Sequence, residues 1–171
     1  MREASSFFID TIFISCYFND GDVMKSDIVV KIDDIILNIR VGIIFKYHDN
    51  VLIEIRKDRT GNSVIPGGRV KIDEYRVDAL KREIKEEMGI TLVDEKIKYK
   101  DTIEEFFDFD NKKFHEIFFV YEYEMDEYFY QELLNVKENK DNHITDYIFV
   151  SYDEFDKVNL LPMKIRDIIK E

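Results

Sequence analysis

Residues 68–90 of this 171-residue chain read GRVKIDEYRVDALKREIKEEMGI. The stretch begins with Gly68, directly after a short apolar run. From about residue 75 its apolar residues have the spacing of a helix, and Gly89 is expected to end that helix. Glu83, Glu86 and Glu87 stand at positions i, i+3 and i+4, so they project from one side of that helix within about one turn. Such like charges repel, and a hard divalent cation that prefers carboxylate oxygen would neutralise them. We therefore predict a site for Mg²⁺, with Mn²⁺ as the alternative ion.

Three helical glutamates alone are also typical of a solvated acidic face. The full spacing is more specific, because it matches the pattern G-x5-E-x7-R-E-U-x-E-E-x-G-U, with U apolar, at every defined position. At average amino-acid usage, seven specified residues at fixed spacings arise by chance on the order of once in 10⁸ starting positions. This pattern is the Nudix box, and the chain resembles Nudix hydrolases of the MutT type from about residue 39 to residue 171.

The resemblance implies an α/β/α sandwich with a mixed β-sheet, in which the box forms a loop, a helix and a second loop. The hydrophobic pattern agrees. It predicts strands over residues 28–32, 35–47, 51–57, 63–64, 97–109, 114–124 and 147–150, and helices over residues 75–88 and 162–169. Residues 126–143 are mostly polar and are expected to form a loop or a marginal helix. We expect residues 1–26 to be an N-terminal extension, with Met24 as a hypothetical start, and residues 27–171 to be the Nudix domain.

The resemblance also implies roles for the box residues. Glu86 and Glu87 match the principal metal ligands, and Glu83 matches a further ligand or the general base. The two adjacent ligands diverge by about 100° around the helix axis, so we expect them to hold different metal positions or opposite sides of one ion. Glu74 is expected either to reach the same centre or to pair with Arg82.

Two further box positions have expected roles of their own. Arg82 stands four residues before Glu86 and is expected to orient Glu86 or Glu74; the alternative is an ordinary surface ion pair. Gly68 permits a close backbone approach, so its carbonyl is a candidate for completing the metal shell.

Candidates outside the box rest on weaker signals. Glu116 interrupts the apolar run Phe114–Phe118 and is our candidate for a general base, with an edge or rim glutamate as the equal alternative. Arg40, Arg56, Arg59, Arg69 and Lys71 precede or open the box and are candidates for contacts to a distal phosphate or a ribose, with Arg69 preferred.

Composition narrows the class of partner. A hydrophobic content of 45% indicates an ordered globular protein, and a single cysteine rules out an intrachain disulfide and fits a reducing cytoplasm. The net charge of −12 argues against nucleic acid and anionic membranes as partners, and no apolar run reaches the ~20 residues of a membrane span. We expect a cytoplasmic protein with a small-molecule nucleotide substrate, and the sequence leaves a homodimer open.

The box predicts a nucleoside diphosphate linked to another group without identifying that group. Phe106 occupies the position where many ADP-ribose hydrolases have proline, and Phe107 and Asp108 stand near the position of a tyrosine typical of dinucleoside-polyphosphate hydrolases. A nucleoside triphosphate, a nucleotide sugar and ADP-ribose all remain candidates. The alternative is a Nudix-fold sensor that binds a nucleotide without turnover, but all four box carboxylates are present and favour an enzyme. The negative charge also counts against an RNA-end hydrolase.

Overall fold

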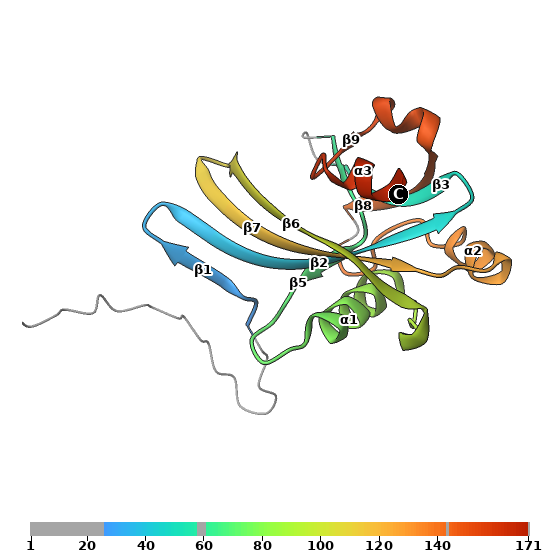
Figure 1. Ribbon diagram of the computed structural model, residues 1–171, viewed down its shortest axis with the longest axis horizontal. Helices are drawn as coiled ribbons and strands as arrows, with labels where there is room; N and C mark the ends of the chain where they lie inside the picture. The colour runs from blue at the N-terminus through green and yellow to red at the C-terminus, as the bar shows by residue number, and fades with distance from the viewer. Residues whose placement is uncertain (1–25, 58–60, 143, 171) are drawn as a thin grey trace, which may run out of the picture.

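The computed structural model describes residues 26–57, 61–142 and 144–170. Its centre is a strongly curled sheet in the order β6-β7-β2-β3-β4-β9, with β1 and β5 also paired to β2 and β8 to β3 (Figure 1). The β2–β7 and β4–β9 pairs are parallel and the other pairs are antiparallel, so the sheet is mixed, as predicted. The strands are β1 (Val29–Ile32), β2 (Ile35–Tyr47), β3 (Asn50–Arg56), β4 (Asn62–Val64), β5 (Gly67–Arg69), β6 (Ile97–Phe109), β7 (Lys112–Tyr123), β8 (Thr145–Ser151) and β9 (Asn159–Leu160).

Helices cover both faces of the sheet, each over its own apolar core. On one face, α1 (Arg76–Met88) and α2 (Glu127–Leu133) pack on alternate residues of β2 such as Val41, Ile43 and Phe45. On the other face, the 3₁₀ helix η2 (Tyr152–Lys157) and α3 (Ile165–Lys170) pack on Ile44 and its neighbours. Figure 1 shows α1 below the sheet and α3 above it. The predicted α/β/α sandwich is confirmed.

The sheet splits where the box loop enters. β2 pairs with β3 only at Lys46–Val51 and Tyr47–Asn50, next to the turn that joins them. Beyond that turn β2 pairs with β5, whereas β3 pairs with β4 and β8. The chain crosses from one half to the other at residues 65–66, where the Pro66 carbonyl accepts a hydrogen bond of 2.9 Å from the Ile43 N–H. The box therefore begins at the split.

The polar stretch 126–143, expected to form a loop or a marginal helix, contains the seven-residue α2. Asp126 caps this helix by accepting a 2.9 Å hydrogen bond from the Phe129 N–H. The C-terminal helix begins at Ile165 instead of residue 162. The predicted extension 1–26 and the Met24 start lie outside the described residues, except for Ser26. Among the helices that the structure describes, none is long and apolar enough to cross a membrane.

Candidate metal and active site

Helix α1 positions the box glutamates by burying its other side. Ala79, Leu80, Ile84 and Met88 are all buried against the sheet, as their spacing predicted. The helix ends at Gly89, which adopts φ 77° and donates its N–H to the Lys85 carbonyl. A left-handed conformation of this kind favours glycine at a helix C-terminus. With the apolar side fixed, the glutamates are held beside the split in the sheet.

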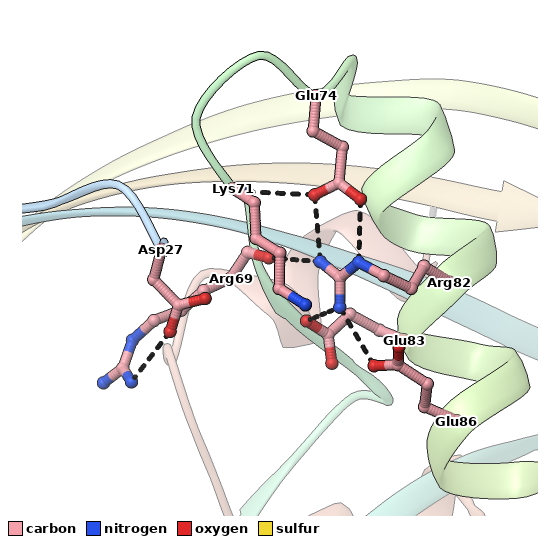
Figure 2. A network of polar contacts seen from close by, with 7 residues as sticks. All are labelled: Asp27, Arg69, Lys71, Glu74, Arg82, Glu83 and Glu86. Atoms are coloured by element: carbon pink, nitrogen blue, oxygen red, sulfur yellow. Dashed lines mark hydrogen bonds and ion pairs between the residues drawn. The ribbon is translucent and has the colours of Figure 1, made fainter. Parts of the chain in front are cut away.

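Arg82 is the centre of the polar network in Figure 2. Its Nε and Nη2 donate hydrogen bonds of 2.7 and 2.9 Å to the two carboxylate oxygens of Glu74. Its Nη1 donates to Glu83 at 2.7 Å and to Glu86 at 3.1 Å, and Nη2 also donates to the Arg69 carbonyl at 3.0 Å. One guanidinium therefore orients three box carboxylates and ties them to the strand that opens the box.

The Arg82 hydrogen bonds hold the pKa of Glu74 below its usual range. Glu74 also accepts a 3.0 Å hydrogen bond from the Lys71 N–H, which closes the turn before α1. Of the two roles expected for Glu74, the structure shows the pairing with Arg82. Glu74 thus supports the site through Arg82.

Glu83 lies directly against Gly68. A Cβ atom at residue 68 would be 2.2 Å from Glu83 Cδ and 2.4 Å from Glu83 Oε2, closer than real contacts allow. Burial raises the pKa of Glu83 although Arg82 acts in the opposite direction. The glycine at this position is therefore required by the approach of a carboxylate to the backbone of β5.

Glu87 faces inward, away from this network, toward Glu54 of β3. Glu54 is 8% exposed, and burial raises its pKa. Burial and the charge of Glu54 together raise the pKa of Glu87 to about 8. Tyr147, which pairs with Glu54 in the β3–β8 ladder, donates its hydroxyl to Glu87 at 3.4 Å. Two carboxylates from different elements thus lie close enough for their charges to interact.

The carboxylates form two groups, an outer one around Arg82 and an inner one between Glu54 and Glu87. Within the described ranges no three His, Cys, Asp or Glu side chains converge as a ready-made metal site. The donor set nevertheless fits a divalent cation, because these carboxylates are hard oxygen ligands and the burial of Glu83 and Glu87 disfavours their charged forms. A cation would remove that penalty.

The sequence model of the NUDIX domain matches residues 37–170. The chain belongs to the NUDIX domain family. The prediction of a Nudix pyrophosphohydrolase, hence an enzyme that hydrolyses nucleotide diphosphate linkages in general, is confirmed at this level. None of the curated proteins matches the sequence.

Solved structures of Nudix proteins are similar in fold. A MutT protein from Bacillus halodurans is 22% identical with a TM-score of 0.55, over 78% of this chain and 80% of its own. A MutT protein from Methanosarcina mazei Go1 is 26% identical with a TM-score of 0.50, over 78% and 91%. An Ap4A hydrolase from Caenorhabditis elegans is 15% identical with a TM-score of 0.50, over 78% and 92%.

The structure does not bring Glu116 together with the Nudix box. Glu116 alternates along β7 with Ile117, which pairs with Ile39 of the core on the α1 side, so its side chain points to the opposite face. There it is 6% exposed and accepts a 2.8 Å hydrogen bond from Asn38 Nδ2. The role of Glu116 as a base stays a prediction.

Of the predicted arginines, Arg59 lies outside the described residues, and the others separate into two groups. The charges of Arg40 and Arg56 lower the pKa of Glu54, so both lie near the inner carboxylates. Arg69 instead directs its guanidinium toward Asp27, with Nη1 3.6 Å from the carboxylate, and Figure 2 shows it pointing away from α1. Its contribution to the site is the backbone carbonyl that holds Arg82.

The prediction from sequence missed Glu54, together with Tyr147 and Asn139. A signal for Glu54 was present: a carboxylate interrupts the apolar run Val51–Ile55, as Glu116 interrupts its own strand. The same argument applied to β3 would have found it. Tyr147 and Asn139 carry no such signal, because only the β3–β8 pairing brings their segment to the box.

Proposed function

We propose that this Nudix protein is a Mg²⁺-dependent hydrolase of a nucleoside diphosphate linked to another moiety, and that water attacks at phosphorus. One observation carries the proposal: α1 holds Glu83 directly against the Gly68 backbone and Glu87 beside Tyr147 and Glu54, and both glutamates have raised pKa values. Carboxylates with raised pKa values would serve as ligands if a divalent cation binds beside them.

The residues of the Nudix box have different proposed roles. Glu83, Glu86 and Glu87 would hold the cation, with the Gly68 carbonyl as a candidate fourth oxygen. When bound, a divalent cation binds the diphosphate, acidifies the attacking water and stabilises the leaving phosphate. Arg82 keeps Glu83 and Glu86 oriented from the outer side, so it acts as a positioning residue.

Glu83 is suited to accept the proton of the attacking water. Its Oε1 accepts the Arg82 hydrogen bond, whereas its Oε2 lies over Gly68. A buried carboxyl group with a raised pKa is a stronger base than an exposed one, and general bases work best when their pKa lies near the operating pH. Oε2 is therefore the atom that we assign to the proton.

Positive side chains near the carboxylates would neutralise the phosphate groups. Lys71 lies in the network of Figure 2, and its charge lowers the pKa of both Glu74 and Glu83. The charges of Arg40 and Arg56 lower the pKa of Glu54, so both arginines lie near that carboxylate. A diphosphate bound between these groups would meet cations at both ends, which supports their assignment to substrate.

The proposed class of substrate is the one that membership of the Nudix family implies. The similar structures include MutT proteins and an Ap4A hydrolase, but their identities to this chain are low. We keep a nucleoside triphosphate, a nucleotide sugar and ADP-ribose as candidate substrates. The single cysteine supports a location in the cytoplasm, and the net charge of −12 supports small nucleotides as the substrates.

A panel of these nucleotides assayed with Mg²⁺ tests the proposal. We expect turnover of at least one nucleotide to a nucleoside monophosphate, measured by chromatography, and loss of that turnover in Glu86→Gln. Glu104→Gln, an exposed carboxylate on β6, is the matched control and should keep wild-type turnover. Nucleotide binding without turnover would instead support a sensor.

A further inference from the structure

We infer that Glu54 is a further ligand of the metal centre, which together with Glu87 binds a hydrated divalent cation in the split between β2 and β3. This inference rests on the proposed function and deepens it, because Glu54 lies outside the Nudix box. The residues that carry it come from four elements of the chain: β3, α1, β8 and the segment between α2 and β8.

The two carboxylates are joined through one tyrosine. Glu54 and Tyr147 are register partners in the antiparallel β3–β8 pair. The Tyr147 hydroxyl donates to Glu87 Oε2 at 3.4 Å, and burial followed by the charges of both glutamates raises the pKa of Tyr147. The phenol therefore faces both carboxylates at once, which places Glu54 and Glu87 on two sides of the same space.

This space is negative in spite of the arginines around it. Arg40 and Arg56 lie near Glu54, but Glu54 is only 8% exposed, and this burial raises its pKa in spite of both positive charges. Glu87 meets the charges of both Glu54 and Glu83. Buried like charges are costly unless a cation or a proton intervenes, and a divalent ion neutralises two carboxylates at once.

Asn139 gives a second, independent indication of a ligand. Its side chain is completely buried, and its Oδ1 accepts hydrogen bonds from the N–H groups of Asp141 and Asn142 at 2.9 and 3.2 Å. Those bonds turn Nδ2 toward Glu54 and Glu87, whose pKa values the amide lowers. Yet Nδ2 makes no hydrogen bond of ordinary geometry within the described residues.

A buried amide donor aimed between two carboxylates needs an oxygen to bind. Mg²⁺ loses its waters reluctantly and keeps several of them when it binds proteins. A water in the outer hydration sphere of a cation held by Glu54 and Glu87 would accept the Nδ2 hydrogen bond. One hydrated ion thus accounts for both the paired carboxylates and the orphan donor.

If Glu54 has a purely structural role, a different result is expected for its substitution. If Glu54 and Glu87 only share a proton, Glu54→Gln replaces one acid by a neutral group of the same shape and leaves metal affinity unchanged. If Glu54 binds the ion, the same substitution removes a ligand charge and weakens binding.

Titration of Mn²⁺ by electron paramagnetic resonance, without nucleotide, separates these cases in wild type, Glu54→Gln, Glu87→Gln and Glu104→Gln. We expect Glu104→Gln to bind like wild type and both Glu54→Gln and Glu87→Gln to bind at least ~10-fold more weakly, as for loss of a charged ligand. Wild-type affinity in Glu54→Gln with weakened binding in Glu87→Gln would overturn the role of Glu54 and leave the proposed function intact. No bound Mn²⁺ in the wild type would overturn both.

Thermal unfolding provides a readout that does not depend on activity. In EDTA, Glu54→Gln should unfold at the same temperature as wild type or higher, because a buried like charge is gone. In Mg²⁺ the rise in melting temperature should be smaller in Glu54→Gln than in wild type and Glu104→Gln. An equal rise in all three proteins would contradict the inference.

Discussion

Glu86 and Glu87 are adjacent in the sequence, but their carboxylates face different partners. Half of the Glu86 side chain is exposed, and it accepts a 3.1 Å hydrogen bond from Arg82. Glu87 is turned inward to Tyr147, where the charge of Glu54 also acts on it. The divergence follows from the ~100° between successive helical residues. We therefore expect the two residues to respond differently to the same substitution.

Glu86→Gln should lower turnover by at least ~10²-fold, because it removes a ligand charge that holds the catalytic ion. Since the side chain is half exposed, the free energy of unfolding should change by less than about 0.5 kcal/mol. Steady-state kinetics and denaturant unfolding of the same preparation check both expectations. Unchanged turnover would remove Glu86 from the metal site.

Gly68→Ala should reduce turnover through Glu83. The new methyl group would lie 2.2 Å from Glu83 Cδ, so the carboxylate must move away from the β5 backbone. A displacement of about 1 Å at a catalytic group can cost ~10²-fold in rate. Gly61→Ala is a control for turnover only: nothing lies within 4 Å of the added carbon, but the left-handed φ of 59° at Gly61 disfavours alanine and lowers stability. Equal kinetics in the two variants would contradict the placement of Glu83.

The stability of the metal-free protein should fall as pH rises. Burial and Glu54 raise the pKa of Glu87 from 4.5 to about 8. Between these values the unfolded chain has lost this proton while the folded protein retains it, so the free energy of unfolding decreases with pH. The decrease should be complete above about pH 8, and each unit of pKa shift corresponds to about 1.4 kcal/mol.

Denaturant unfolding in EDTA across this pH range measures the effect. Glu87→Gln should remove most of the slope, since it no longer titrates. Added Mg²⁺ should also reduce it, because a bound cation stabilises the ionised form. A slope that is the same in Glu87→Gln and wild type would show that other groups cause it.

Glu116→Gln distinguishes the two general bases predicted from the sequence, Glu116 and Glu83. Removing a general base typically costs ~10²–10⁴-fold, but Glu116 faces away from α1 and binds Asn38, so we expect a change below ~3-fold. Glutamine can still accept the Asn38 hydrogen bond and preserve the fold. A loss of ~10²-fold in kcat with unchanged KM would restore Glu116 as the base.

The fold could be predicted from sequence where periodicity was strong. Strands β2 and β6 have the predicted ends, and the buried side of α1 is the predicted one. Helix α2 was uncertain because its seven residues are mostly polar or aromatic, and its start depends on the Asp126 cap instead of an apolar stripe. Short helices of this kind are stabilised by tertiary contacts, which single-sequence reasoning does not contain.

The outer half of the candidate site followed from the box, since Arg82, Glu83 and Glu86 are close in sequence and their spacing on a helix fixes their contacts. Of the inner half, only Glu87 followed from the box. Glu54 and Tyr147 meet Glu87 only because β3 pairs with β8 and both lie beside α1. Pairings between residues so far apart depend on the complete sheet, and no local pattern encodes them.

Calorimetric titration of Mg²⁺ into the wild-type protein, with and without a non-hydrolysable nucleotide, tests most directly whether the Nudix box binds dications. We expect saturable binding that is lost when Glu83, Glu86 and Glu87 are all replaced by glutamine, while circular dichroism shows an intact fold. Absence of binding at millimolar Mg²⁺ and Mn²⁺ in both titrations, or equal binding by the triple variant, would contradict the account.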